Sequence, residues 1–187
     1  MTRVGRRTLI RRGIRLGVGL GLAPTLGSGQ DSPASIRPKE GDLLVRVGDS
    51  GTKPLTPDYI PAGSMQMMAW AMDPTDNTVR SGSRLNLVLL LRLPADRLSS
   101  ETQSRAADGV VAYTAICTHT GCEVDEWIAD EQFLYCPCHF SKFDPRDGAR
   151  VVDGPAPRAL AALPLKLVNG KLVVAQPFTA RVGFEPA

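Results

Sequence analysis

The chain of 187 residues is long enough for one domain with a buried core, and its 43% hydrophobic and 22% charged residues are typical of a globular protein. Its formal charge of +3 comes from the first 29 residues, which hold six arginines and no acid, whereas the remainder has 16 basic and 19 acidic residues, a net −3. A weakly acidic body without a basic stripe argues against nucleic-acid binding.

The first predicted element is an export signal in residues 1–29. Arg6 and Arg7 form a pair within "GRRTLIR" (5–11), and a mildly apolar, glycine-rich run of about 14 residues follows Arg15. This layout resembles a twin-arginine signal, and the alternative is a disordered basic tail. The apolar run is shorter than the roughly 20 residues that span a bilayer, so at most a weak anchor or peripheral membrane contact is expected.

Residues 30–42 are predicted to be a linker, because "PASIRPKEGD" at 33–42 is rich in proline and charge. Beyond it, short runs of apolar and β-branched residues alternate with turn residues, which predicts an all-β domain over 43–187. The clearest element is a hairpin at 165–174, where Asn-Gly supplies the two positive φ angles of a type I′ turn. A short helix or surface loop is expected at 94–109. The other strands are predicted at 43–47, 64–70, 84–93, 110–117, 132–136 and 149–154.

All four cysteines and both histidines lie within residues 117–139, in the motifs "CTHTGC" (117–122) and "CPCH" (136–139). Two thiolates and two imidazoles could hold a structural zinc ion, but two cysteines would be left over. Four cysteines could hold an iron–sulfur cluster, but both histidines would be left over. Thiol–disulfide exchange is disfavoured, because neither motif has the C-x-x-C spacing of that chemistry.

Both motifs resemble the cluster-binding loops of Rieske iron–sulfur proteins, in the disulfide-containing branch found in quinol-oxidising complexes and in arsenite oxidase small subunits. The resemblance covers about residues 110–158, and it implies stacked antiparallel sheets with a small cluster-binding subdomain inserted. It also implies a Rieske-type 2Fe-2S cluster, in which two histidines replace two cysteines on one iron. The implied ligands are Cys117 and Cys136 on one iron and His119 and His139 on the other, with a disulfide between Cys122 and Cys138.

Five further residues gain a role through the same resemblance. Ser141 matches the serine that donates a hydrogen bond to a bridging sulfide, and Phe143 stands where quinol-oxidising complexes have a tyrosine that donates to a cysteine sulfur. Gly154, Pro155 and Pro157 belong to "GPAP", which matches a proline loop that shields the cluster. Hydrogen bonds to sulfur stabilise the reduced state, so phenylalanine at 143 predicts a lower reduction potential.

Two residues at the tips of the loops differ from the quinol-oxidising pattern. Thr120 replaces a leucine beside the first histidine, and Phe140 replaces a glycine beside the second. Phenylalanine at that position is more similar to the arsenite oxidase small subunits. The resemblance implies that these tip residues form the surface that docks on a quinol site.

The function that the resemblance implies is transfer of single electrons, coupled to proton uptake at the histidines. The protein would be a subunit or partner of a respiratory oxidoreductase, such as a quinol–cytochrome c reductase or an arsenite-oxidase-like enzyme. Expected partners are a cytochrome c, a cytochrome b complex or a molybdenum subunit, with quinol as a further candidate. No catalytic residue is expected, and a Rieske oxygenase is excluded because its mononuclear iron needs two more histidines.

The expected location is the periplasm or the outer face of the bacterial inner membrane. A structural disulfide persists outside the reducing cytosol, and the twin-arginine pattern points to the same compartment. The alternative function is a zinc-stabilised Cys/His binding module without a redox role.

Overall fold

The computed structural model describes residues 32–49, 52–63 and 65–184, so the predicted signal in residues 1–29 lies outside the described residues. Six strands form one sheet in the order β4-β3-β2-β1-β10-β9, and four strands form a second sheet in the order β5-β6-β7-β8. All neighbouring strands in both sheets are antiparallel. The all-β fold of stacked antiparallel sheets is therefore confirmed.

The six strands of the larger sheet are β1 (Leu43–Arg46), β2 (Met67–Met72), β3 (Val88–Arg92), β4 (Val110–Thr114), β9 (Leu165–Val168) and β10 (Lys171–Val174). The smaller sheet consists of β5 (Glu126–Ile128), β6 (Phe133–Cys136), β7 (Ser141–Asp144) and β8 (Arg150–Asp153). Helical structure is limited to α1 (Ser100–Ser104) and the 3-10 turns η1 (Pro33–Ser35), η2 (Pro57–Tyr59), η3 (Arg84–Asn86) and η4 (Ala95–Arg97) within the described ranges.

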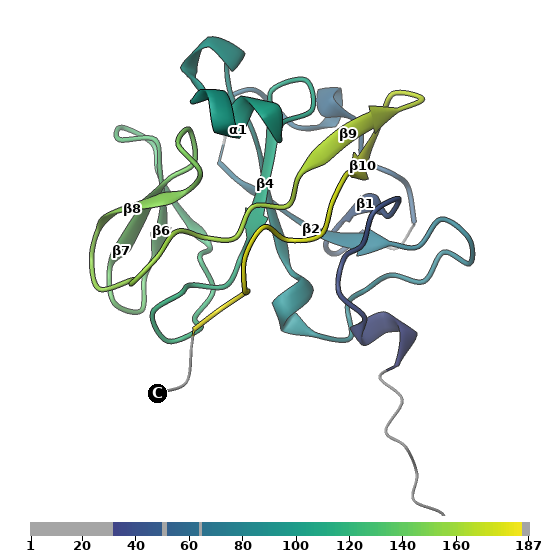
Figure 1. Cartoon of the computed structure of the whole chain (residues 1–187), viewed down its shortest axis with the longest axis horizontal. Helices are drawn as coiled ribbons and strands as arrows, with labels where there is room; N and C mark the ends of the chain where they lie inside the picture. Colours follow the sequence, from purple (N-terminus) through teal and green to yellow (C-terminus); the bar gives the residue numbers. More distant parts are fainter. Residues whose placement is uncertain (1–31, 50–51, 64, 185–187) are drawn as a thin grey trace, which may run out of the picture. The chain divides into compact units, whose positions relative to one another are not determined.

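The smaller sheet is an insertion between two strands of the larger one. The chain leaves the larger sheet at the end of β4 and returns to it at β9, after completing all four strands of the smaller sheet. Figure 1 shows β6, β7 and β8 together on one side of β4, with β9, β10, β1 and β2 on the other. The smaller sheet is therefore called the inserted sheet.

Strand β3 connects the cores of the two sheets because both of its faces are buried. Successive side chains of a strand point to opposite faces. Leu89 and Leu91 face a core that the inserted sheet shares through Leu134 and Phe143. Val88 and Leu90 instead belong to a second core within the larger sheet. Burial of both faces explains the uninterrupted apolar run of this strand, and the shared core fixes the inserted sheet against the larger one.

The hairpin predicted at 165–174 is confirmed. Strands β9 and β10 pair in antiparallel register, with Val168 opposite Lys171. Between them Asn169 and Gly170 have φ angles of 51° and 74°, as a type I′ turn requires.

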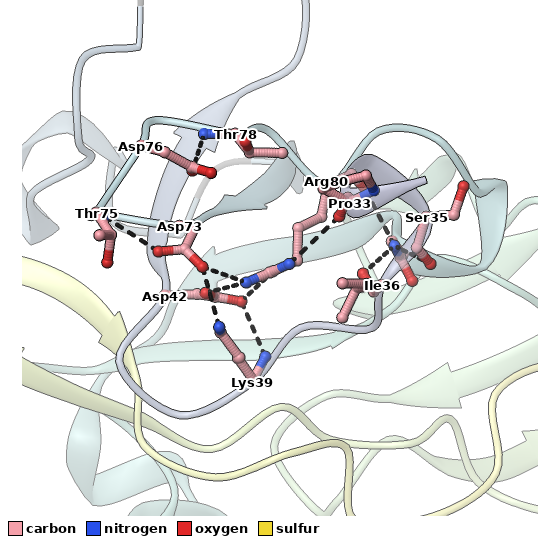
Figure 2. A network of polar contacts seen from close by, with 11 residues as sticks. Pro33, Ser35, Ile36, Lys39, Asp42, Asp73, Thr75, Asp76, Thr78 and Arg80 are labelled. Carbon is pink, nitrogen blue, oxygen red and sulfur yellow. Dashed lines mark hydrogen bonds and ion pairs between the residues drawn. The ribbon is translucent and has the colours of Figure 1, made fainter. Parts of the chain in front are cut away.

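The segment that composition marks as a linker, residues 33–42, is bound to the larger sheet. Figure 2 shows the polar network around Arg80, whose guanidinium donates to both carboxylate oxygens of Asp42 over 2.6 and 2.8 Å. The same guanidinium contacts Asp73 at 3.0 Å, and Asp73 also pairs with Lys39 at 3.0 Å. The side chains of Arg80 and Asp42 are 2% and 0% exposed, so this part of the segment belongs to the folded domain.

Candidate functional site

Two loops carry every cysteine and histidine of the chain. The first loop follows β4 and is closed by hydrogen bonds from the Cys117 amide to the Cys122 carbonyl (2.8 Å) and from the Gly121 amide to the Cys117 carbonyl (3.1 Å). The second loop joins β6 to β7, and the amide of Phe140 donates to the carbonyl of Cys136 over 2.9 Å. Each loop is thus a tight turn that holds one thiol and one imidazole.

The structure brings the predicted cysteines and histidines together from both loops. The imidazole rings of His119 and His139 lie 4.6 Å apart between centroids and are nearly perpendicular, at 89°. A disulfide joins Cys122 to Cys138 and so cross-links the loops. The other two cysteines, Cys117 and Cys136, are free thiols and are each 1% exposed. The result is a buried pair of thiols beside a pair of imidazoles.

The surroundings of Cys136 suit a thiolate bound to a cation. Burial and, to a smaller extent, the nearby Cys117 raise the pKa of this thiol to about 11. The backbone amides of Cys138 and His139 act in the opposite direction, because they donate hydrogen bonds to the sulfur. Amide donors directed at a buried sulfur stabilise its anionic form. A bound metal would supply the positive charge that offsets the cost of burying a thiolate.

The donor set fits a centre with two irons. Within the described part of the chain, the buried Nδ1 of His119 has no hydrogen-bond partner. A buried ring nitrogen of this kind needs a partner, and a metal is one. The two free thiols and the two imidazoles supply the two protein ligands for each iron that a 2Fe-2S centre of mixed ligation requires.

The segment "GPAP" packs directly on the second loop. The amide of Ala156 donates to the hydroxyl oxygen of Ser141 over 3.1 Å, which leaves the hydroxyl hydrogen available to donate elsewhere. Gly154 has a φ of +88°, and a Cβ at this position would lie 2.5 Å from the Cα of Ser141. Only glycine allows this approach. Pro155 and Pro157, on either side of Ala156, are exposed.

Phe143 lies beneath the second loop. Its side chain is fully buried, and in the inserted sheet it pairs across β6–β7 with Leu134. Both residues belong to the core that the two sheets share. The ring therefore supports the loop by packing, and it offers no donor to a sulfur atom.

Three contacts around the first loop had no signal in the sequence. The hydroxyl of Thr118 donates to the carbonyl of Arg158 over 2.6 Å. The guanidinium of Arg158 in turn donates to the carbonyls of Arg181 and Gly183. On the other side, the guanidinium of Arg84 donates to the carbonyl of Gly121 over 2.5 Å. These bonds attach the loop to the segment after "GPAP", to residues 181–184 and to η3.

The tip of the second loop exposes an aromatic side chain. Phe140 is 64% exposed, and its backbone has a φ of 66°, which is unfavourable for a residue with a bulky side chain. Its ring stacks on Tyr135 with centroids 6.2 Å apart. Thr120, at the tip of the first loop, is exposed as well.

Comparison with known proteins agrees with this geometry. The model of the Rieske [2Fe-2S] domain matches residues 97–164, a range that contains both loops. The chain is 33% identical over 126 residues to the cytochrome bc1 complex Rieske iron–sulfur subunit of Streptomyces lividans, with 66% of this chain and 73% of that subunit covered. It is 41% identical over 106 residues to a putative respiratory nitrate reductase Rieske subunit of Haloferax mediterranei, with 56% and 47% covered.

Other similarities extend over smaller parts of the matched proteins. The chain spans 35% of the length of the corresponding Streptomyces coelicolor subunit. The crystal structure of the soluble domain of Rieske protein II from Sulfolobus acidocaldarius superposes with a TM-score of 0.39 at 21% identity, covering 51% of this chain and 66% of that one. Within the described ranges of this chain, no helix has the length and apolar character needed to cross a membrane.

Proposed function

The chain belongs to the Rieske iron–sulfur family, whose domain binds a 2Fe-2S cluster, and on that premise we propose that it is an exported one-electron carrier. It would act as a subunit or partner of a larger respiratory oxidoreductase. The observation that carries the proposal is the buried pair of free thiols beside two imidazoles, on two loops that a disulfide cross-links.

The ligand set we propose is Cys117 and Cys136 on one iron, and His119 and His139 on the other. The bound cluster supplies a one-electron couple. The chain buries the two thiolates and donates amide hydrogen bonds to one of them. Its two imidazoles have a second ring nitrogen each, and a nitrogen exposed to solvent can exchange a proton.

The names of the relatives support partners within respiratory complexes. One relative is a subunit of a cytochrome bc1 complex and another is named as a nitrate reductase subunit. A cytochrome b complex, a cytochrome c and a molybdenum subunit therefore remain the proposed partners, and quinol the proposed small-molecule donor. The exposed tips, with Phe140 and Thr120, are the proposed contact surface.

We propose export through the twin-arginine route to the periplasm or the outer face of the inner membrane. Arg6 and Arg7 are the residues that such a signal needs. Replacing both by lysine is expected to leave the full-length protein in the cytoplasmic fraction of the producing cell, as measured by immunoblot after osmotic shock. Unchanged appearance in the periplasmic fraction would contradict the twin-arginine route.

Metal analysis separates the proposed function from the zinc-stabilised alternative. Protein purified without added metal is expected to be reddish brown and to contain about two irons and two acid-labile sulfides per chain. Stoichiometric zinc in a colourless, fully folded protein would contradict the proposal and favour a zinc-stabilised binding module.

A further inference from the structure

A hollow of about 260 Å³ lies directly against the first cluster-binding loop. Ile116 and Gly121 of that loop form part of its wall, and Phe184 forms another part. Three arginines also line the hollow: Arg37, Arg84 and Arg181. We call this hollow the arginine pocket.

Among the described residues, the three arginines of the pocket have no acidic partner. Arginines elsewhere in the domain, such as Arg80, Arg105 and Arg146, form ion pairs with Asp or Glu. Arg37, Arg84 and Arg181 form no ion pair with any carboxylate in the described ranges. Burial lowers the pKa of Arg37, as expected for a cation that no anion compensates.

This concentration of positive charge contrasts with the rest of the body. The chain after residue 29 has 16 basic and 19 acidic residues. The acidic residue nearest along the loop is Glu123, which is exposed and bridges to Ile116 through the backbone. Its carboxylate forms no ion pair with the three arginines. The pocket is therefore a local cationic site on the weakly acidic part of the chain that follows residue 29.

The rim of the pocket is held in place by hydrogen bonds to backbone carbonyls. Arg84 donates to Gly121, the residue before Cys122 of the disulfide. Arg37 donates to the carbonyl of Leu85 over 2.6 Å. The carbonyl of Arg181 accepts from Arg158 over 2.8 Å. Because the guanidinium groups of Arg37 and Arg84 are held beside the cluster-binding loop, a partner that they attract would arrive next to that loop.

The lining combines positive charge with exposed apolar surface. Phe184 is 46% exposed and packs so closely on Gly121 that a Cβ there would lie 2.9 Å from its ring. Arginine and aromatic side chains are the groups that contribute most to protein–protein contacts. Fixed charges of one sign also raise the rate at which an oppositely charged partner docks.

We propose that the arginine pocket docks an acidic surface segment of the protein that exchanges electrons with this chain. This inference rests on the proposed electron-transfer function. The segment would place a carboxylate among the three guanidinium groups and an apolar side chain on Phe184. Docking there would bring the partner against the first loop, close to His119.

The test uses cytochrome c in two forms that carry the same haem, the native basic protein and the same protein with its lysines succinylated. Full-length reduced protein is mixed with each ferric cytochrome in a stopped-flow instrument, and one electron passes to the ferric haem. At an ionic strength of about 10 mM, the variant Arg37→Gln/Arg181→Gln is expected to react with the succinylated form about fivefold more slowly. Its rate with the native form should be unchanged or higher.

The matched control is Arg46→Gln/Arg97→Gln, which removes two exposed arginines elsewhere on the domain and changes the net charge equally. It should leave the ratio of the two rates within about twofold of the wild type. An equal loss in both double variants, or an unchanged ratio in the pocket variant, would overturn the inference.

These outcomes are distinct from failure of the proposed function. Wild-type protein that reduces neither cytochrome contradicts the proposed function. If electrons pass to the cytochromes but the pocket arginines do not change the ratio of the two rates, only the docking inference is contradicted.

Discussion

Phe143 has a packing role, and the family resemblance implies a second role at the site. Its ring is fully buried in the core shared by the two sheets, so packing alone accounts for an aromatic residue here. The resemblance implies that a tyrosine at this position would donate its hydroxyl hydrogen to a cysteine sulfur. We expect phenylalanine to keep the packing but, without that donor, to leave the reduced state less stable.

The variant Phe143→Tyr is expected to raise the midpoint potential. A hydrogen bond contributes about 0.5–1.5 kcal/mol, which corresponds to roughly 20–60 mV for a one-electron couple. Protein-film voltammetry measures the shift. The control Phe178→Tyr adds a hydroxyl to a partly buried ring outside the cluster-binding loops and should leave the potential unchanged. An unchanged or lower midpoint for Phe143→Tyr would show that packing is the only role of this ring.

Individual residues of the site differed in how far sequence could reveal them. The cysteines and histidines were identifiable because few chemistries use these side chains at such spacing. Thr118 and Arg158 act through backbone carbonyls, and any residue can supply a carbonyl. No residue pattern therefore marks such contacts. The positive φ of Phe140 was equally hidden, because it depends on how the loop closes.

Among the strands, those with a continuous apolar or alternating pattern were predicted, and two of the shortest were missed. β5 (Glu126–Ile128) and β7 (Ser141–Asp144) have only three and four residues, and three of the four side chains of β7 are polar. They are strands because β6 pairs with both. β2 starts at Met67 rather than at 64, and residues 84–86 form η3 before β3 begins. Pairing across a sheet decided these boundaries, and local sequence does not contain that information.

The contact between "GPAP" and the second loop can be tested by substitution of its glycine. Gly154→Ala would add a Cβ 2.5 Å from the backbone of Ser141, at a φ of +88°. We expect the loops to separate and the purified protein to contain less than half of the wild-type iron. Gly48→Ala is the matched control, because its φ is +86° and nothing lies within 4 Å of the added carbon. It should cost about 1 kcal/mol and keep the cluster. Equal iron contents in the two variants would contradict the role of this contact.

At the scale of the whole molecule, the Arg80 network attaches residues 33–42 to the larger sheet, on which the inserted sheet packs. Composition marked this segment as a linker because proline and charged residues usually lie in exposed connections. Here the charges of Asp42 and Arg80 are buried together, and Asp42 raises the pKa of the guanidinium. Burial of a paired charge depends on residues that are far apart in sequence, which the composition of one segment does not reveal.

Arg80→Met is expected to destabilise the protein by about 3–5 kcal/mol, because it leaves the carboxylate of Asp42 buried without a partner. The double variant Asp42→Asn/Arg80→Met should lose less than the sum of the two single variants. Arg92→Met is the control, since its partners Asp58 and Asp108 are 91% and 53% exposed, and its cost should stay below about 1 kcal/mol. Thermal unfolding followed by circular dichroism gives the Tm of each variant and so ranks their stabilities. Equal Tm values for Arg80→Met and Arg92→Met would contradict the structural role of the buried pair.

Mixed sulfur and nitrogen coordination is the claim on which the functional account depends, and electron paramagnetic resonance tests it most directly. After reduction with dithionite, the full-length protein is expected to give the spectrum of a 2Fe-2S centre with an average g value below that of clusters bound by four thiolates. Replacing His139 by cysteine should move the average toward the all-thiolate value or abolish the signal. A wild-type average g value equal to that of all-thiolate clusters would show that neither histidine is an iron ligand, and would contradict the account.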